Sequence, residues 1–350
     1  MSQTVAVTSA DITKYLADAA KRLPFSVLEI QTITEVESGN NNYSFFLNRA
    51  DGTRFFLRKA APYNRRSVLK GKPVSVDPKR IETEVAMLTL LNKLWGRQFV
   101  PEIIFYDQGQ QILIESDISQ GMQQLSKEFA QRRIYPQHGK TCGRLFATLH
   151  AKTFNDKKEF SRSLSFKKTF LDVLVDDFWG RGLRAYVDPQ LVEQWLAEVR
   201  ETPQAVVWSD AVYKNIFVNH SQICFIDFDQ ACTYDPAFDN GLLLAHWAWM
   251  FLLTSTKKDA ERFISDFIKN YCRIIQAASV MSSAQLEALL ERTRRWVGYY
   301  LVSRTDGASG SYFAQWPNWE AEIRHLGIDL FLQRVSSPAA AWLTNTIRLV

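Results

Sequence analysis

The hydrophobic pattern of this 350-residue chain changes once, and this change constrains the fold more than any other feature. Up to about residue 115, several segments alternate apolar and polar side chains, as strands with one buried face do. Beyond Gly121, apolar side chains mostly recur at three- and four-residue steps, as in amphipathic helices. The sequence therefore predicts an α+β fold with two lobes, a β-rich N-terminal lobe over residues 1–116 and a mainly helical C-terminal lobe over residues 117–350.

Local signals place the main elements of both lobes. Asp51-Gly52 lies between two apolar segments and predicts a tight hairpin, and Asp77-Pro78 opens the one helical run that interrupts the strands. No Pro/Gly/Ser-rich linker follows residue 116, so we expect a short hinge there. In the second lobe, a small β island is expected within residues 206–227. Helices are expected over residues 137–153, 167–179, 189–199, 238–253, 257–277, 283–302 and 319–334.

Composition excludes several protein classes. The net charge of +5, from 42 basic and 37 acidic residues, is too small to indicate a nucleic-acid partner by itself. The apolar run over residues 241–253 is too short to span a bilayer and predicts a buried helix, so no membrane partner is expected. Four cysteines without a CxxC pair favour reduced thiols in a cytoplasmic protein. The sequence does not decide whether the protein forms a homodimer.

An Asp, an Asn five residues later and an Asp that ends a nearby apolar strand indicate phosphoryl transfer. These residues are Asp210, Asn215 and Asp227. Phosphoryl transfer needs an aligned hydroxyl and a metal ion on the phosphates, which carboxylate and amide oxygens provide. We predict that Asp210 aligns the acceptor and takes its proton late, and that Asn215 and Asp227 bind Mg²⁺. Asp229 is expected either to contact these metal ligands without touching the ion, or to bind a second metal ion.

Residues of the first lobe predict an ATP site. Lys59 ends an apolar strand and Glu84 lies on the next helix, as expected for a lysine that holds ATP phosphates and is oriented by a carboxylate. The polar turn with Gly39, Asn40 and Asn42 can present backbone N–H groups to phosphates. The segment over residues 113–118, with Glu115 and Asp117, is expected to offer backbone groups to an adenine edge.

These motifs resemble those of the kinase-like phosphotransferases, the superfamily of aminoglycoside phosphotransferases, choline kinases and methylthioribose kinases. Its catalytic motif usually reads His-Gly-Asp-x4-Asn and its metal motif Ile-Asp-Phe/Pro-Asp/Glu. Here they read Trp208-Ser209-Asp210 with Asn215, and Ile226-Asp227-Phe228-Asp229. Residues 39–42, 59–63 and 80–84 look most like methylthioribose kinase. The resemblance covers nearly the whole chain and implies a protein-kinase-like fold that binds ATP and Mg²⁺ between its lobes and phosphorylates a small-molecule hydroxyl.

The residues expected to bind the acceptor match the family pattern less completely than those expected to bind the phosphates. Arg294 and Arg295 look similar to the arginine-bearing substrate helix of methylthioribose kinases, and one of them is expected to face Asp210; the alternative is an ion pair with Glu291. Trp316, on a polar loop between helices, is a further candidate for the acceptor.

Departures from the family pattern keep alternatives open. Trp208 and Ser209 replace His and Gly, Asp229 replaces the Glu of methylthioribose kinases, and Leu301 stands where their His is expected. The acceptor could therefore be a methylthioribose-like sugar, an aminoglycoside or an amino alcohol such as choline. A nucleotide-binding protein without transferase activity is the alternative from another class.

Overall fold

The computed structural model describes residues 7–36, 41–65, 75–155, 174–306 and 317–348. The chain divides into two compact units, Met1–Gln120 and Gly121–Val350, where the sequence predicted a division after residue 116. The first unit is built on a β-sheet and the second is mainly helical, so the predicted α+β fold class is confirmed.

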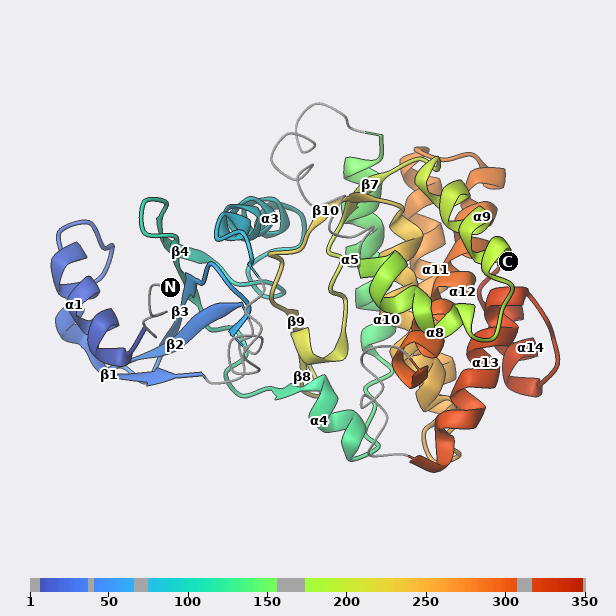
Figure 1. Cartoon of the computed structure of the whole chain (residues 1–350). Helices are drawn as coiled ribbons and strands as arrows, with labels where there is room; N and C mark the ends of the chain where they lie inside the picture. Colours follow the sequence, from blue (N-terminus) through green and yellow to red (C-terminus); the bar gives the residue numbers. More distant parts are fainter. Residues whose placement is uncertain (1–6, 37–40, 66–74, 156–173, 307–316, 349–350) are drawn as a thin grey trace. The chain divides into compact units, whose positions relative to one another are not determined.

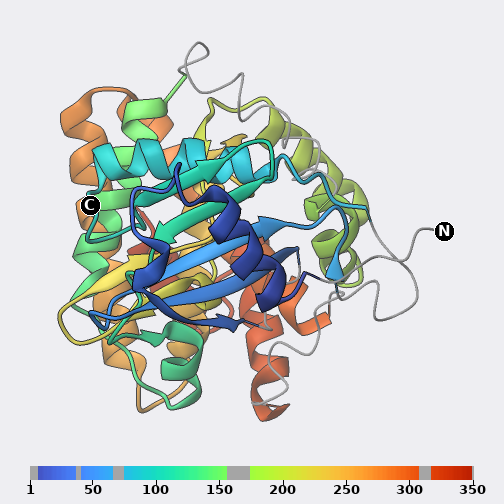
Figure 2. The same ribbon diagram turned by 90° about the vertical axis from the view of Figure 1, so that its left-hand side faces the viewer.

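The first unit contains a five-stranded antiparallel sheet with the strand order β1-β2-β3-β5-β4 (Figures 1 and 2). Its elements are α1 (Ser9–Ala19), β1 (Ile30–Glu35), β2 (Asn42–Arg49), β3 (Arg54–Ala60), α3 (Arg80–Leu94), β4 (Ile103–Asp107) and β5 (Ile112–Ser116). The predicted hairpin at Asp51-Gly52 is confirmed, because β2 pairs with β3 across it and Gly52 has a φ of +82°.

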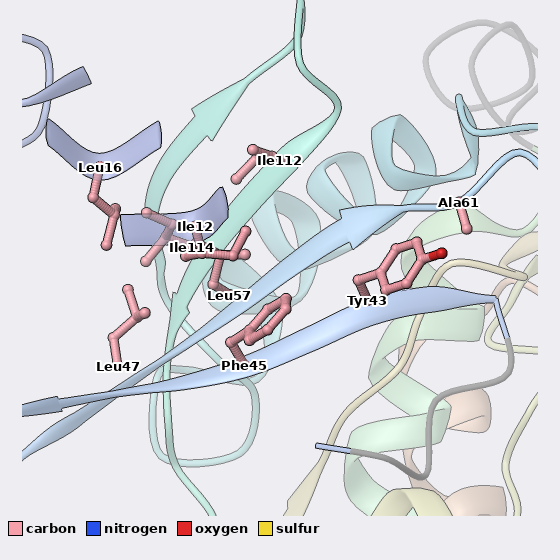
Figure 3. Packing of buried hydrophobic residues seen from close by; sticks show 9 residues of the cluster. All are labelled: Ile12, Leu16, Tyr43, Phe45, Leu47, Leu57, Ala61, Ile112 and Ile114. Carbon is pink, nitrogen blue, oxygen red and sulfur yellow. The ribbon is translucent and has the colours of Figure 1, made fainter. Parts of the chain in front are cut away.

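The hydrophobic core of this unit lies on one face of the sheet, under α1 (Figure 3). Thr8 caps α1 by accepting a hydrogen bond from the backbone N–H of Asp11, and the helix buries Ile12 and Leu16. Alternate positions of the strands supply the other side of this core: Tyr43, Phe45, Leu47, Leu57, Ile112 and Ile114. Because side chains alternate across a strand, the residues between them point to the opposite face.

The second unit holds short strands among many helices. It contains β6 (Gln123–Gln124), α4 (Leu125–Ala130), α5 (His138–Thr153), a π-helical segment η3 (Leu174–Trp179), α8 (Gly180–Arg184), α9 (Pro189–Arg200), β7 (Ala205–Val207), a 3-10 turn η4 (Tyr213–Asn215), β8 (Ile216–Val218), β9 (Ile223–Phe225), β10 (Cys232–Tyr234), α10 (Pro236–Met250), α11 (Lys257–Ala278), α12 (Ser283–Asp306), a 3-10 turn η5 (Pro317–Trp319), α13 (Glu320–Leu332) and α14 (Pro338–Thr346). The β island expected within residues 206–227 is present as β7, β8 and β9; β7 pairs with β10, and β8 pairs with both β9 and β6. Strands β6 and β10 and helices α4, α8 and α14 were not predicted from the sequence.

Helix α10 is the centre of the second unit. All fifteen of its residues are buried, which confirms the buried helix predicted from the apolar run. Helix α5 approaches α11 closely at Gly139 and Gly143, where a Cβ atom would lie 2.3 Å from the carbonyl oxygens of Phe263 and Phe267. No helix in the described part of the chain is both long enough and apolar enough to cross a membrane.

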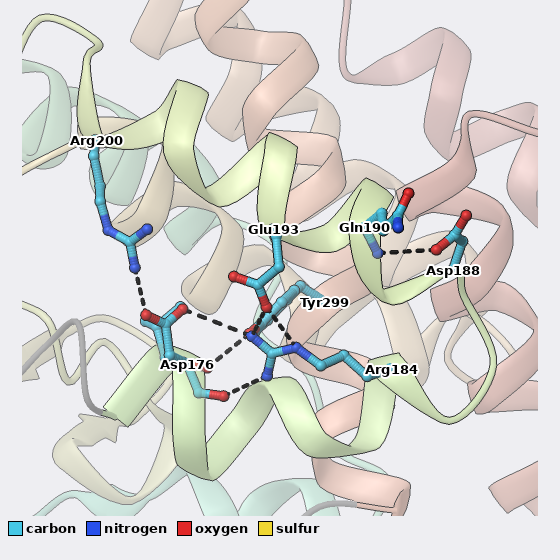
Figure 4. Close-up of polar contacts among 8 residues, drawn as sticks. Asp176, Arg184, Asp188, Gln190, Glu193, Arg200 and Tyr299 are labelled. Atoms are coloured by element: carbon cyan, nitrogen blue, oxygen red, sulfur yellow. Dashed lines mark hydrogen bonds and ion pairs between the residues drawn. The ribbon is translucent and has the colours of Figure 1, made fainter.

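Ion pairs fix the π-helical segment to its neighbours (Figure 4). The guanidinium of Arg184 donates from Nε to Glu193 Oε1 at 2.9 Å and from Nη1 to the carbonyl oxygen of Asp176 at 2.5 Å. Arg200 of α9 forms an ion pair with Asp176, and the hydroxyl of Tyr299 on α12 donates to the carbonyl oxygen of Val175 at 2.7 Å. These bonds hold η3 against α9 and α12.

Candidate active site

Asp210 and Asn215 meet on the short loop between β7 and β8. The amide Nδ2 of Asn215 donates to Asp210 Oδ2 at 2.8 Å and to the Asp210 carbonyl oxygen at 3.1 Å. The 3-10 turn that ends at Asn215 makes this contact possible, because it folds a five-residue separation back on itself. The structure thus brings the predicted base and the predicted metal ligand into direct contact.

A buried carboxylate on α10 fixes the backbone before Asp210. Asp239 accepts hydrogen bonds from the backbone N–H groups of Trp208 at 2.6 Å and Ser209 at 2.9 Å. Ser209 has a φ of +66°, in the left-handed region that favours glycine. The motif that this segment resembles usually has glycine here, and in this chain a serine adopts a conformation that favours glycine while Asp239 accepts a hydrogen bond from its N–H.

Trp208 also holds the second motif in place. Its indole Nε1–H donates to the carbonyl oxygen of Asp227 at 2.8 Å, and Asp227 itself has a φ of +69°. The indole is fully buried between aromatic rings, with Phe225 at 5.6 Å and Phe228 at 5.0 Å between centroids. Histidine at this position could donate one N–H in the same way, so Trp208 keeps a donor there without a group that titrates.

Backbone bonding connects the two predicted metal ligands. The N–H of Ile226 donates to the carbonyl oxygen of Asn215 at 3.0 Å, so the residue before Asp227 is tied to Asn215. Since the Asn215 amide nitrogen is given to Asp210, its amide oxygen is the atom that can ligate a cation. Asp229 is buried at 5% exposure.

The donor set fits magnesium on a nucleotide. Within the described ranges, no three His, Cys, Asp or Glu side chains are grouped so that they could hold a metal ion. Mg²⁺ in nucleotide sites is usually held by one or two protein groups together with phosphate oxygens and water. The amide oxygen of Asn215 and the carboxylate of Asp227 are hard oxygen donors of this kind.

The sequence reasoning missed Lys214, which lies beside the predicted base. Its Nζ atom is 3.4 Å from Asp210 Oδ2, and its side chain is half exposed. The charge of Asp210 first, and that of Asp227 as well, raise the pKa of Lys214. The ammonium group therefore stays charged near both carboxylates, and its position next to Asn215 was the only signal for it in the sequence.

In the first unit, the structure corrects the predicted lysine-carboxylate pair. Lys59 pairs in the sheet with Tyr43 and Ile112, which belong to the core under α1, and its Nζ donates to the Gln110 carbonyl oxygen at 3.1 Å. Burial lowers the pKa of Lys59. Lys59 thus points to the opposite face of the sheet from Glu84, so the prediction that Glu84 orients it is wrong.

Arg58, and not Lys59, is the β3 cation that lies beside Glu84. It is buried at 3% exposure, and its Nη2 atom lies 3.0 Å from Glu115 Oε1 and 3.5 Å from Glu84 Oε1 on α3. A guanidinium between two buried carboxylates is held in one geometry, because its planar fork can serve both. The pairing of β3 with β2 and β5 separates Arg58 from Lys59, and the sequence of β3 alone does not provide it.

The other predicted nucleotide residues have structural partners. Asn42 begins β2, and its side-chain oxygen accepts a hydrogen bond from Arg80 Nη2 at 2.6 Å. Glu115 accepts from Arg58, and Asp117 accepts from Arg54 Nε at 2.8 Å. Gly39 and Asn40 lie outside the described residues. The nucleotide-binding roles of all these residues stay predictions.

Two of the three predicted acceptor residues are described by the structure, and the described charged groups beside them do not include Asp210. Arg295 Nη2 lies 3.6 Å from Glu291 Oε1, which is the alternative weighed from the sequence. Arg294 is buried at 4% exposure. Burial lowers its pKa most; the charge of Glu291 raises the pKa, and the charges of Arg348 and Arg295 lower it. Trp316 lies outside the described residues.

Comparisons with known proteins agree with this geometry. The family model described as "Phosphotransferase enzyme family" matches residues 32–285. No curated protein sequence matches the chain significantly.

Solved structures show where the fold is similar. A choline/ethanolamine kinase family protein from Mesorhizobium loti has a TM-score of 0.50 at 13% identity, over 96% of this chain and 99% of that one. An ethanolamine kinase from Plasmodium vivax has a TM-score of 0.51 at 12% identity, over 99% and 90%. An amicoumacin kinase, solved with AMP-PNP and Ca²⁺, has a TM-score of 0.51 at 14% identity, over 91% and 93%. At these identities the likeness concerns the fold.

Proposed function

The chain belongs to the phosphotransferase enzyme family, and from this premise we propose that it transfers the γ-phosphoryl group of ATP to a hydroxyl group of a small molecule. The observation that carries the proposal is the contact between Asp210 and Asn215, with Asp227 tied to the same loop. Base, amide and carboxylate are the groups that phosphoryl transfer requires. The AMP-PNP bound to the amicoumacin kinase is consistent with ATP as donor.

The residues have distinct roles in the proposed reaction. Asp210 Oδ1 and Oδ2 align the acceptor hydroxyl and receive its proton late, while the Asn215 amide keeps the carboxylate in place. Asn215 and Asp227 would hold Mg²⁺, which neutralises charge on the phosphate oxygens when bound. In the first unit, Arg58 rather than Lys59 would contact the phosphates, with Glu84 and Glu115 orienting its guanidinium.

The alternative without transferase activity has less support. It was motivated by Trp208 and Ser209 in place of His and Gly. Trp208 still donates a hydrogen bond to the Asp227 carbonyl, and Ser209 still has the left-handed backbone conformation. Both departures therefore keep the local geometry of the loop.

The identity of the acceptor is the finer part of the proposal. Similarity in residues 39–42, 59–63 and 80–84 supports a methylthioribose-like sugar, but these residues belong to the first unit. Arg294 and Arg295 add no support, because Arg295 pairs with Glu291 and the charges that act on Arg294 are those of Glu291, Arg348 and Arg295. Aminoglycosides and amino alcohols remain the alternatives.

The experiment that tests the proposal compares Asp227→Asn with Asp259→Asn, a control on an exposed position of α11. We expect Asp227→Asn to lose Mg²⁺-dependent ADP release and the thermal stabilisation by Mg-ATP, because stabilisation follows binding to the native state. Asp259→Asn should keep both. Full activity of Asp227→Asn at every magnesium concentration would refute the metal assignment.

A further inference from the structure

The second unit carries an arginine that the proposed reaction does not use, near the C-terminal end of α12. Arg304 is half-buried, and the Cζ atom of its guanidinium lies 4.6 Å from the centroid of the Tyr300 ring and 5.4 Å from that of Trp179. The two rings are buried and contact each other edge to face at 5.5 Å. The guanidinium therefore rests on a fixed aromatic support.

A row of rings connects this arginine to the loop that carries Asp210. Tyr213, three residues after Asp210, contacts His246 at 5.1 Å between ring centroids, and His246 contacts Tyr300 at 5.3 Å. The backbone N–H of Tyr213 donates to His246 Nε2 at 3.4 Å. Arg304 and Tyr213 thus lie at the two ends of one packed group of side chains, and Tyr213 belongs to the loop that carries Asp210.

His246, in the middle of this row, carries no charge. Burial, with a smaller contribution from the charge of Arg304, lowers the pKa of His246 to about 3. His246 is therefore neutral at physiological pH. Its Nδ1–H donates to the Leu242 carbonyl oxygen at 2.8 Å, which leaves Nε2 as the acceptor.

Asp210 already faces a cation of the protein, because Lys214 Nζ lies 3.4 Å from its Oδ2 atom. Choline-like ammonium groups are typically bound on aromatic faces. At Tyr300 and Trp179 the protein's own Arg304 makes that interaction.

We propose that the acceptor is a hydroxylated metabolite with an anionic group, a carboxylate or a phosphate, which Arg304 binds while Lys214 lies beside the reacting hydroxyl. A guanidinium is the side chain best suited to this role, because its fork binds two oxygens of a carboxylate or phosphate at once. The aromatic support under Arg304 limits the rotamer freedom lost on binding. This inference rests on the proposed function, and it gives that function a substrate class.

The test measures ADP release by the full chain with Mg-ATP and a matched acceptor panel. Each set contains a parent sugar, its aldonic acid and its phosphate, and choline and ethanolamine complete the panel. We expect kcat/KM to be at least about tenfold higher for anionic members than for their neutral parents, since hydrogen bonds between charged groups are the stronger ones. The acid and the phosphate arms show which anion is bound.

The variant Arg304→Gln tests whether Arg304 binds the anionic group of the acceptor. It should raise KM for the anionic acceptor roughly 10- to 100-fold with KM for ATP unchanged. Arg304→Lys, which keeps the charge and the aromatic support but loses the fork, should raise KM less and covers the case in which Arg304→Gln folds poorly. Arg273→Gln, on an exposed position of α11, is the charge-matched control and should behave as wild type.

The outcomes separate the two proposals. Preference for neutral or cationic acceptors, turnover of no anionic member while Mg-ATP still stabilises the protein, or an unchanged acceptor KM in both Arg304 variants would overturn the anionic acceptor alone. Absence of any Mg-ATP stabilisation and of any ADP release would instead overturn the proposed function.

Discussion

Replacing Arg58 and Lys59 separately by methionine tests which cation of β3 contacts the nucleotide. The two residues are neighbours in sequence, but they point to opposite faces of the sheet. We expect Arg58→Met to weaken binding of Mg-AMP-PNP strongly and Lys59→Met to leave it nearly unchanged. The structure therefore predicts the opposite of what the motif suggests when it is read from the sequence.

The effect of Arg58→Met on stability follows from burial. The side chains of Arg58, Glu84 and Glu115 are all at most 3% exposed, so the variant leaves two buried carboxylates without their shared guanidinium. Removing one partner of a buried ion pair costs about 3–5 kcal/mol. Lys59 loses only one hydrogen bond, from Nζ to the Gln110 carbonyl oxygen, which is worth about 1 kcal/mol.

The assay must report on the first unit alone, because two compact units need not unfold together. Native-state hydrogen exchange of the β3 and β5 amides gives the local opening free energy, and calorimetric titration gives the affinity for Mg-AMP-PNP. The variant Arg58→Met/Glu84→Gln/Glu115→Gln removes the buried charges together and should recover most of the lost stability. It should still bind nucleotide weakly. Normal nucleotide affinity in this triple variant, or weak binding in Lys59→Met, would refute the assignment of Arg58.

Three further predictions concern the second unit. Asp210→Asn should lower kcat by orders of magnitude with little change in ATP affinity, because Asp210 is proposed to act in the transition state; equal losses in kcat and affinity would make it a structural residue. Trp208→Phe should raise the Mg²⁺ concentration needed for half-maximal activity, because it leaves the Asp227 carbonyl without its donor, and Trp208→His should restore much of the loss at neutral pH; equal behaviour of both variants would count against the indole N–H. The hydrogen bond from Arg133 lowers the pKa of Glu128 below 4.5, so this carboxylate stabilises the fold above that pH and the contribution is lost as pH falls through the folded-state value. Glu128→Gln should therefore cost about 1–2 kcal/mol in denaturant unfolding at pH 7 and almost nothing in acid, and a cost independent of pH would contradict this.

Features that depend on nearby residues were predictable from the sequence. The hairpin at Asp51-Gly52 is set by two residues that accept positive φ or local side-chain bonding, and α10 by a continuous apolar run. The contact between Asp210 and Asn215 spans five residues and needs only a tight turn. Local spacing was sufficient in all three cases.

Features that depend on strand register or distant packing were not predictable. Both alternate sets of positions in β3, from Arg54 to Ala60, contain apolar and charged residues, so its pattern does not tell which face receives α3. A shift of one residue exchanges Arg58 for Lys59, and only the pairing with β2 and β5 fixes the choice.

The residues proposed to bind the acceptor were also not predictable, because their placement depends on packing between helices. Arg294, Arg295 and Arg304 all lie on α12, and a helical period alone cannot tell which of them packs near the Asp210 loop. The packing of α10 against α12, through His246 and Tyr300, makes that choice. No local sequence signal marks Arg304.

The transfer of radiolabelled γ-phosphate in a single turnover tests the central claim most directly. Wild-type protein and Asp210→Asn would each be mixed with Mg²⁺, labelled ATP and the best acceptor of the panel, and the labelled products would be separated. We predict that wild-type protein moves the label to the acceptor hydroxyl and that Asp210→Asn does so orders of magnitude more slowly. Label that stays in ATP, appears only as inorganic phosphate, or reaches the acceptor equally fast in both proteins would contradict the account.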